Sequence, residues 1–197
     1  IYRGRTKGSV TAPPSKSYAQ RAIAAALLCR GETVLTNMVY CNDTRAALQV
    51  ARDLGAEVVC TEDACTIRGG LRPSGRELNV GESGLATRLF TPVTALCGEE
   101  IVLTGEGSLL GRPISMMEAP LRELGAEISS REGYLPIRVK GPVRGGQATV
   151  DGSLSSQFIT GLLMSLPLAE RDTTMNVADL KSKPYIDMTI GLPEAFG

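Results

Sequence analysis

The chain has 197 residues, 43% of them hydrophobic, and its 21 Lys and Arg residues balance 21 Asp and Glu residues. This length supports one or two compact domains, and a formal charge of zero argues against general binding to nucleic acids or membrane surfaces. No apolar run is long enough to span a bilayer and no signal peptide opens the chain, so we expect a cytoplasmic protein without a membrane anchor.

The cysteines and the missing histidine restrict the chemistry further. Five cysteines without C-x-x-C spacing, together with no histidine, argue against a zinc site and favour a reducing compartment. Without histidine, neither Ser-His-Asp nor Cys-His catalysis is available within this chain. The chain begins at Ile1 rather than Met and ends at Phe196-Gly197, so we expect it to be part of a longer protein.

Hydrophobic periodicity predicts a unit of strand, helix, strand, helix, strand and strand over residues 8–70. Gly31 and Gly55 end its two helices, and Asn42-Asp43 caps the second one. The last two strands form a hairpin around Glu62-Asp63. The six elements are expected at residues 8–12, 17–29, 33–36, 42–54, 57–60 and 66–68.

The same succession of elements is predicted twice more. In the second copy, residues 77–141, the elements are expected at 77–80, 85–96, 101–103, 116–124, 127–129 and 136–139. Pro92 lies inside the first of these helices and is expected to kink it. The third copy, residues 147–197, is expected to contain elements at 147–150, 155–166, 173–177 and 185–195, and to lack its closing hairpin.

The positions of matching residues identify these segments as repeats. Arg21 and Arg88 occupy equivalent positions, and Leu54-Gly55-Ala56-Glu57 recurs as Leu124-Gly125-Ala126-Glu127. Tandem βαβαββ repeats predict an α/β fold with pseudo-threefold symmetry. Because the first helix of each repeat is apolar nearly all round, we expect these helices to bundle in the interior with their N-termini at one end.

Each repeat begins its first helix with residues suited to anions, at 15–21, 81–88 and 152–157. A helix N-terminus has unpaired N–H groups and a partial positive charge. Lys16 is a compact charge suited to phosphate, and Arg21 offers a planar fork suited to a carboxylate. One such junction alone also fits ordinary helix capping with solvated charges, but its recurrence favours a substrate that carries more than one negative group.

Four motifs resemble the 5-enolpyruvylshikimate-3-phosphate synthase (3-phosphoshikimate 1-carboxyvinyltransferase) family: residues 14–21, 111–114, 150–158 and 182–187. The resemblance implies one domain of the two-domain enolpyruvyl transferase fold, an inside-out α/β barrel. The chain would form most of the N-terminal domain, and the C-terminal domain would lie outside it. The implied reaction transfers enolpyruvate from phosphoenolpyruvate to the 5-hydroxyl of shikimate 3-phosphate in aromatic amino acid biosynthesis. It implies no metal or organic cofactor, and a monomer.

The resemblance also implies the roles of particular residues. The predicted contacts to shikimate 3-phosphate come from Lys16, Ser17, Arg21, Ser155, Ser156, Gln157, Ser182 and Tyr185. The predicted contacts to phosphoenolpyruvate come from Lys16, Gly84, Arg112 and Gln157. The acid and base carboxylates of the family belong to the other domain, so no catalytic residue maps to this chain. We expect the chain alone to bind shikimate 3-phosphate weakly and to turn nothing over.

Three residues around the second junction leave questions open. The family commonly has Asn at Glu82 and Thr at Leu85. A carboxylate at Glu82 would repel the phosphate of phosphoenolpyruvate unless it is protonated or paired with Arg88 or Arg112. Arg88 is accordingly either a site residue or a structural partner of Glu82. Leu85 is expected to narrow the phosphoenolpyruvate pocket and to weaken binding of the inhibitor glyphosate.

Two alternatives compete with the function that this resemblance implies. The sister family that transfers enolpyruvate to UDP-N-acetylglucosamine has a Lys-Asn pair where this chain has Lys16-Ser17. That family also uses a cysteine in the loop corresponding to Leu110-Gly111-Arg112, where this chain has none. The other alternative is a non-catalytic anion-binding module. The joint presence of Lys16, Arg21 and Arg112 with the serine-rich third junction argues against it.

Overall fold

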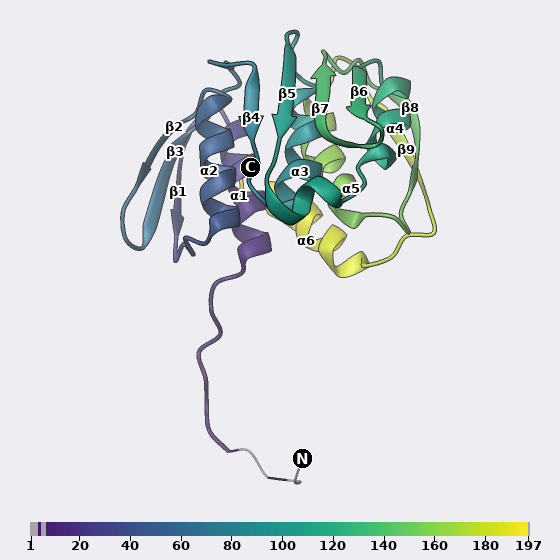
Figure 1. Cartoon of the computed structure of the whole chain (residues 1–197). Helices are drawn as coiled ribbons and strands as arrows, with labels where there is room; N and C mark the ends of the chain where they lie inside the picture. Colours follow the sequence, from purple (N-terminus) through teal and green to yellow (C-terminus); the bar gives the residue numbers. More distant parts are fainter. Residues whose placement is uncertain (1–3, 5–6, 197) are drawn as a thin grey trace.

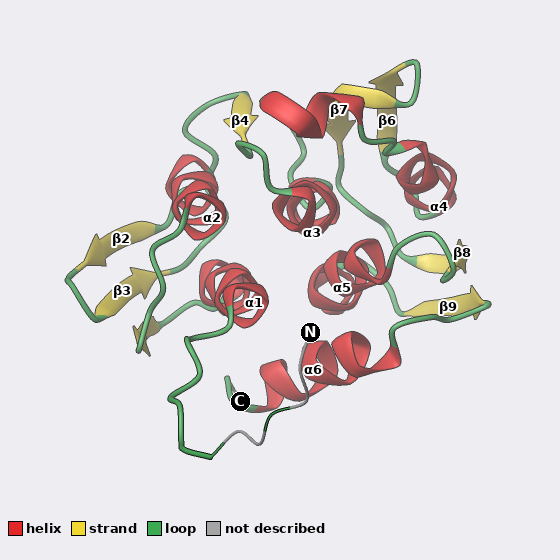
Figure 2. Ribbon diagram, turned by 60° about the horizontal axis from the view of Figure 1, so that its bottom comes forward, coloured by secondary structure: helices red, strands yellow, loops and turns green. Residues whose placement is uncertain are grey.

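Helices lie at the centre of the molecule and strands lie on the outside (Figures 1 and 2). The computed structural model describes residue 4 and residues 7–196. The α-helices are α1 (Lys16–Leu28), α2 (Asn42–Asp53), α3 (Gly84–Thr94), α4 (Glu118–Glu123), α5 (Ser156–Ser165) and α6 (Lys183–Glu194). Short 3-10 helices are η1 (Gly107–Gly111), η2 (Ser115–Met117) and η3 (Leu166–Leu168).

The strands form three separate sheets, which follow one another along the chain. The first sheet has the order β1-β3-β2 and is antiparallel. The second has the order β4-β5-β7-β6, in which β4 and β5 are parallel and the other pairs are antiparallel. The third is the parallel pair β8-β9. The strands are β1 (Glu32–Thr36), β2 (Glu57–Cys60), β3 (Ala64–Arg68), β4 (Glu77–Asn79), β5 (Glu100–Thr104), β6 (Glu127–Arg131), β7 (Tyr134–Lys140), β8 (Gly146–Asp151) and β9 (Thr173–Ala178).

The first helix of each repeat is buried, as the sequence predicts. In Figure 2 the helices α1, α3 and α5 lie together at the centre of the molecule. Every residue of α3 is buried, including Pro92, and the helix continues through that proline. Most residues of α1 are small or aliphatic, which lets the helix pack on nearly all sides, and Ile23 and Leu27 are fully buried. An arrangement with helices inside and sheets outside is the predicted pseudo-threefold α/β fold.

The predicted strand at residues 8–12 is wrong. This segment forms no strand, and Val10 is 94% exposed. Figure 1 shows the chain before α1 leading away from the body of the molecule. In the second sheet the equivalent strand, β4, pairs with β5, whereas the corresponding edge of β1 has no strand partner within residues 7–196. A strand without a partner gains no ladder hydrogen bonds, and Pro13 and Pro14 lack the N–H groups to extend one.

The remaining elements agree with the sequence-based expectations, with small differences at their ends. The predicted helix at 116–124 is split, because η2 forms its first turn and α4 begins at Glu118. The second hairpin strand begins at Ala64 rather than Thr66. Within the described part of the chain, no helix combines the length and the apolar character needed to cross a bilayer.

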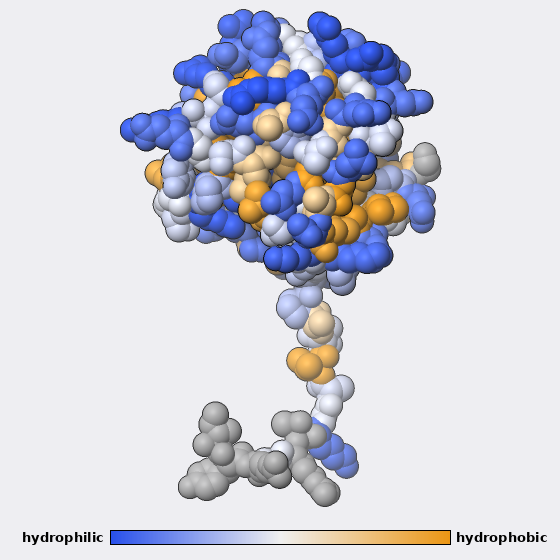
Figure 3. Space-filling model, turned by 90° about the vertical axis from the view of Figure 1, so that its right-hand side faces the viewer, coloured by the Kyte–Doolittle hydropathy of each residue, from blue (hydrophilic) through white to orange (hydrophobic). Residues whose placement is uncertain are grey.

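The side of the molecule that carries β8 and β9 exposes a mixture of polar and apolar side chains (Figure 3). Apolar surface gathers in the lower half of this view, while hydrophilic residues dominate the upper half. The β8-β9 sheet has two strands where the second sheet has four. The apolar surface therefore borders the smallest of the three sheets.

Candidate functional site

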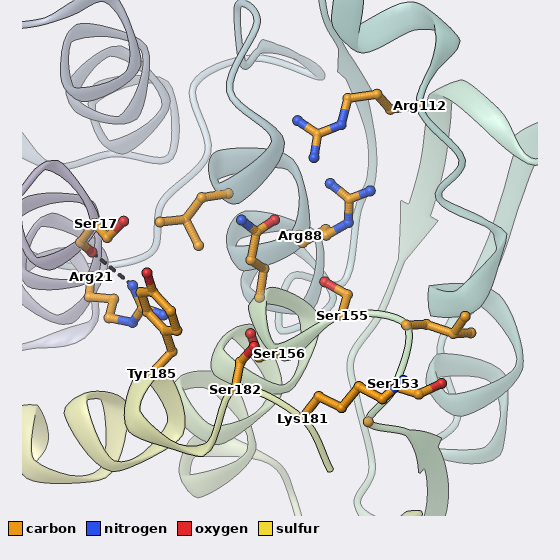
Figure 4. Close-up of a pocket in the computed structure, with 14 residues that line it drawn as sticks. Ser17, Arg21, Arg88, Arg112, Ser153, Ser155, Ser156, Lys181, Ser182 and Tyr185 are labelled. Atoms are coloured by element: carbon orange, nitrogen blue, oxygen red, sulfur yellow. Dashed lines mark hydrogen bonds between the residues drawn. The ribbon is translucent and has the colours of Figure 1, made fainter. Parts of the chain in front are cut away.

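A pocket of about 390 Å³ lies where the N-terminal ends of α1, α3, α5 and α6 meet. Figure 4 shows side chains from all four helices directed into it. Nine of the candidate contact residues predicted from the sequence line this pocket: Ser17, Arg21, Arg88, Arg112, Ser155, Ser156, Gln157, Ser182 and Tyr185. Segments far apart in the chain thus meet at the place that the repeated junctions predict.

The pocket wall is strongly cationic. Four of its side chains are basic, namely Arg21, Arg88, Arg112 and Lys181, and no lining residue is acidic. The ion pairs of the described residues include none of these four side chains. Unpaired cations that converge on one cavity create a positive potential there, which attracts anions.

Arg21 is a buried cation that only neutral groups hold in place. Its side chain is 1% exposed, and its Nη1 donates to the carbonyl oxygen of Ser17 at 2.9 Å (Figure 4). Its Nε and Nη2 donate to the hydroxyl oxygens of Thr189 and Thr160, at 2.9 and 3.1 Å. Burial lowers the pKa of Arg21 below its ordinary value. The guanidinium also lies 5.9 Å from the ring centre of Tyr185. This network fixes the orientation of the guanidinium but leaves its charge uncompensated.

Arg88 repeats this situation at the second junction. The residue is 5% exposed, and its two Nη groups donate to the carbonyl oxygens of Gly84 and Pro113, at 3.1 and 2.9 Å. Its buried Nε has no hydrogen-bond partner among the residues that the structure describes. Burial, followed by repulsion from Arg112, lowers the pKa of Arg88. Glu82 does not pair with it, so the structural role considered from the sequence is absent.

The four helix N-termini differ in how they are capped. Ser15 and Ser83 accept hydrogen bonds from the backbone N–H groups of Tyr18 and Ala86, which caps α1 and α3. The equivalent caps of α5 and α6 are Ser155 and Ser182, and neither accepts a side-chain cap hydrogen bond. The hydroxyls of Ser155 and Ser182 and the first N–H groups of α5 are therefore available to a bound oxyanion. At α6, Pro184 has no N–H and the N–H of Tyr185 donates to the carbonyl of Ser182 at 3.0 Å.

Backbone contacts hold these two uncapped helix starts beside each other. The N–H of Gly152 donates to the carbonyl of Ala178 at 2.7 Å, and the N–H of Lys181 donates to the carbonyl of Gly152 at 3.3 Å. A Cβ on Gly152 would lie 2.8 Å from the Cα of Leu180, so only glycine permits this approach. Asp151 accepts the N–H of Ser153 at 2.8 Å, and hydrogen bonds from the side chain and then the backbone of Ser153 lower the pKa of the Asp151 carboxyl.

Lys16 does not line the pocket. Its Nζ forms an ion pair with Asp43 at the start of α2, at 2.7 Å. The hydrogen bond that Lys16 donates to the Asp43 carboxylate raises the pKa of Lys16 above its ordinary value. Contact between Lys16 and a ligand in the pocket would require its side chain to leave Asp43.

Gly84 and Glu82 lie beside the pocket rather than in its wall. The guanidinium of Arg112 occupies the space that a side chain on Gly84 would need. Glu82 is exposed, and its carboxylate accepts hydrogen bonds from the N–H and the hydroxyl of Ser108, at 3.3 and 3.1 Å. The Glu82 carboxylate is therefore held by η1 and is not paired with Arg88 or Arg112.

One lining residue, Lys181, was not singled out by the sequence. Leu85 also lines the pocket, as expected, and so do Gly152, Ser153 and Leu154 of the third junction. The predicted motif at the last junction includes Lys183, but that side chain forms an ion pair with Asp187 on α6, at 2.5 Å. Lys181, two positions earlier, supplies the cation of the pocket wall instead (Figure 4). The sequence signal that could have identified Lys181 is its position directly before Ser182, at the start of the last helix.

The pocket is equipped to bind anions rather than to transfer protons. Its polar groups are arginine, lysine, serine, glutamine and tyrosine side chains, and none of the lining residues is a carboxylate or a thiol. The arginine and lysine side chains of the wall act as positive charges toward a bound anion. A general acid or base for chemistry on a bound anion would have to come from outside these lining residues.

Comparisons with known proteins identify the family of the chain. The family model described as EPSP synthase (3-phosphoshikimate 1-carboxyvinyltransferase) matches residues 2–197. Proteins named 3-phosphoshikimate 1-carboxyvinyltransferase from Escherichia coli O1:K1 / APEC and Klebsiella pneumoniae (strain 342) are each 42% identical over 202 residues. The alignment covers 98% of this chain and 47% of each relative, so the chain spans about half their length.

A solved structure described as EPSP synthase from Acinetobacter baumannii has the same fold. It matches with a TM-score of 0.85 and 29% sequence identity, over 96% of this chain and 44% of that one. The sequence match and the structural match cover nearly the whole chain. The chain therefore belongs to the EPSP synthase (3-phosphoshikimate 1-carboxyvinyltransferase) family.

Proposed function

We propose that this chain binds shikimate 3-phosphate and forms one half of the active site of an enolpyruvyl transferase. The observation that carries the proposal is the pair of buried guanidinium groups, Arg21 and Arg88, which lack acidic partners and face one pocket. Buried charges destabilise a protein unless something compensates them. A dianionic or trianionic substrate would supply that compensation.

The arrangement supports a division of the substrate between two ends of the pocket. The 3-phosphate would bind at the uncapped starts of α5 and α6, where Ser155, Ser156 and Ser182 lie beside Lys181. The shikimate carboxylate and ring would lie toward Ser17 and Arg21, with Tyr185 and Gln157 against the ring. These assignments combine the anion chemistry of helix N-termini with the family resemblance.

Phosphoenolpyruvate would occupy the side of the pocket next to Arg112, Arg88 and Leu85, near Gly84. Two adjacent arginines suit a substrate that carries both a phosphate and a carboxylate. Lys16 would join them after leaving Asp43. Glu82, held by Ser108, would not face the phosphate.

The complete reaction would require a second domain. The relatives are about twice as long as this chain, and the pocket wall contains no carboxylate that could serve as acid or base. We therefore propose that residues 1–197 are most of an N-terminal domain, whose repeats run approximately over 8–70, 77–141 and 147–197. The partner domain would close over the pocket and supply the missing groups. We expect a cytoplasmic location, because the free cysteines suit a reducing compartment. We also expect a monomer.

Calorimetric titration tests the binding step. The chain is titrated with shikimate 3-phosphate, with phosphoenolpyruvate and with UDP-N-acetylglucosamine. Saturable binding of shikimate 3-phosphate alone, weakened at least tenfold in a Ser155→Ala/Ser156→Ala double variant, is the expected result. Ser74→Ala, which alters an exposed serine that bonds to the carbonyl of Asp53 outside the pocket, is the control.

Two outcomes would contradict the proposal. Binding of the UDP sugar in preference to shikimate 3-phosphate would favour the sister reaction. Equal binding of shikimate 3-phosphate by the wild type and the double variant would place the anion site elsewhere. Turnover is measured separately: the chain alone is expected to release no phosphate from the two substrates, and release by material free of host enzyme would refute the need for a second domain.

A further inference from the structure

Two cysteines face each other across the β2–β3 hairpin, far from the pocket. Cys60 ends β2 and is the register partner of Cys65 on β3. Their Sγ atoms are 2.7 Å apart. Figure 1 shows this hairpin at the outer edge of the first sheet, on the opposite side from β8 and β9.

The backbone geometry of the hairpin suits a covalent link between the two residues. The N–H of Thr61 donates to the carbonyl of Ala64 at 2.8 Å, which makes these residues a hydrogen-bonded pair. In an antiparallel ladder the next pair, Cys60 and Cys65, is then of the non-hydrogen-bonded kind, in which Cα atoms lie about 4.5 Å apart. Disulfides join residues whose Cα atoms are roughly 4.4–6.8 Å apart, so the pair can be linked without moving the strands.

The two thiols lie in different environments, which sets the order in which they would react. Cys60 is exposed, and the Nη2 of Arg52 lies 3.9 Å from its Sγ. Of the two thiols, only the exposed one can meet a dissolved disulfide, and the guanidinium beside it can attract an anionic one. Cys65 is fully buried, and burial, with its contact to Cys60, raises the pKa of its thiol to about 12. Cys60 is therefore the thiol that attacks the external disulfide first, and Cys65 reacts with Cys60 in the second step.

A surface depression of about 220 Å³ lies beside Cys60. It is lined by Tyr40, Arg45, Leu48, Gln49, Arg52 and Cys60. The hydroxyl of Tyr40 donates to the carbonyl of Ala64 at 2.7 Å, which ties the depression to the turn of the hairpin. The guanidinium of Arg45 lies 5.6 Å from the ring centre of Tyr40. Two arginines and no acidic side chain line this depression, so it favours an anionic ligand.

We propose that Cys60 and Cys65 form a reversible disulfide by exchange with an anionic low-molecular-weight disulfide. The probe is glutathione disulfide, whose carboxylates suit Arg45 and Arg52. This is a modification site separate from the anion pocket, and it does not depend on the proposed substrate. Disulfides in reducing compartments are usually transient or redox-sensing. Because Cys60 is exposed, dissolved disulfides can oxidise this pair and dissolved thiols can reduce it again.

The exchange has two balanced steps. The Cys60 thiolate attacks one sulfur of glutathione disulfide, so a protein–glutathione disulfide forms and one glutathione thiolate leaves and takes a proton. Cys65 then loses its proton and attacks the Sγ of Cys60, which expels the second glutathione thiolate. Two protein thiols are oxidised by two electrons in total, and one glutathione disulfide is reduced to two thiols.

Peptide mass spectrometry tests the proposal directly on the chain. The chain is incubated with glutathione disulfide, blocked with N-ethylmaleimide and digested with trypsin without reduction. Residues 53–68 contain both Cys60 and Cys65 with no internal cleavage site, and the other cysteines fall in separate peptides. The expected peptide is lighter by two hydrogens, carries no maleimide, and gains two maleimides after reduction. Cys97, which is buried, serves as the unreactive reference.

Variants separate this exchange from general thiol oxidation. Cys65→Ser is expected to trap glutathione on Cys60, and Cys60→Ser, at an exposed position, is expected to carry neither glutathione nor the internal link. Arg52→Gln should slow disulfide formation several-fold, whereas Arg138→Gln, an exposed arginine on β7, should leave the rate unchanged. A wild-type peptide 53–68 with two maleimides, or with glutathione that persists on Cys60, would overturn the proposal.

Discussion

The Nε of Arg21 donates a 2.9 Å hydrogen bond to the hydroxyl of Thr189, a residue 168 positions later in the chain. Thr160 completes this contact, because its hydroxyl lies 2.9 Å from that of Thr189 and accepts from Nη2 of Arg21. The cation at the start of the first repeat is thus positioned by two helices of the third, α5 and α6. The folding of the third repeat and the geometry of the anion pocket are therefore coupled.

Thr189→Val tests this coupling. The substitution keeps the shape of the side chain but removes the acceptor of Nε, which leaves a buried donor unsatisfied at a cost of about 1–3 kcal/mol. We expect a lower thermal unfolding midpoint and roughly tenfold weaker binding of shikimate 3-phosphate by calorimetry, since 1.4 kcal/mol corresponds to tenfold. Thr149→Val, at an exposed position on β8, is the matched control and should change neither quantity. Unchanged binding in Thr189→Val would show that Arg21 is held without this bond.

Lys181 and Lys183 allow a matched comparison within one loop. Lys181 lines the pocket, whereas Lys183 is paired with Asp187 on α6. We expect Lys181→Met to weaken binding of shikimate 3-phosphate by about tenfold at low salt, because one charge-assisted contact to the phosphate is lost. The loss should shrink as salt rises, since Lys181 is exposed and its charge is screened. Titration at two ionic strengths measures this, and Lys183→Met should behave like the wild type. An equal effect of both variants would mean that net charge, not position, determines the affinity.

The repeated junctions were sufficient to predict the fold and the location of the pocket. Helix-period apolar residues placed α1, α3 and α5 in the interior, so their N-termini had to converge. The ion-pair and hydrogen-bond partners of individual charged side chains could not be predicted, because they come from distant segments of the chain. Asp43 holds Lys16 from the second helix, and Ser108 holds Glu82 from a 3-10 turn. Neither pairing has a local sequence signal.

The same reason explains the wrong strand at residues 8–12. An alternating apolar pattern predicts a strand only if a neighbour supplies the other half of its hydrogen bonds. The segment lies away from β1 in the structure, and its side chains are exposed. Strand propensity is a local property, whereas sheet membership depends on partners that the local pattern does not identify.

Cys97 predicts a pH dependence of stability. The residue is 8% exposed, and burial, with a smaller contribution from Glu99, raises the pKa of its thiol from 9.0 to about 11. A raised pKa in the folded state stabilises the protonated form, so this contribution is present below pH 9.0 and is lost as the pH rises toward about 11. Two pKa units correspond to at most about 3 kcal/mol. Urea unfolding at pH 8 and pH 11 should therefore show a steeper loss of stability in the wild type than in Cys97→Ala, and parallel losses would contradict the assignment.

We expect Arg88 to lower the thermal stability of the unliganded protein and to strengthen its binding of anionic substrates. It is 5% exposed, its Nε has no partner, and Arg112 repels it, so the empty protein carries an uncompensated buried charge. Replacement of buried ion pairs by apolar side chains of similar volume is often neutral or stabilising, by up to roughly 1–4 kcal/mol, and a buried charge without an acidic partner is less favourable still. We therefore expect Arg88→Met to unfold at an equal or higher temperature than the wild type in the absence of ligand. Its binding of anionic substrates should fall by at least tenfold, because the guanidinium no longer faces the pocket.

Thermal unfolding with and without shikimate 3-phosphate separates the two effects, since a ligand stabilises only a protein that binds it. The wild type should gain several degrees from the ligand, and Arg88→Met should gain little. Arg138→Met, which removes an exposed arginine that pairs with Glu100 at 3.1 Å, should match the wild type in both measurements because surface ion pairs contribute little. A marked loss of stability in unliganded Arg88→Met would assign this arginine to the support of the Gly84 and Pro113 carbonyls. Its charge would then be a structural feature of the second junction, and the substrate would have to be held by Arg21, Arg112 and Lys181.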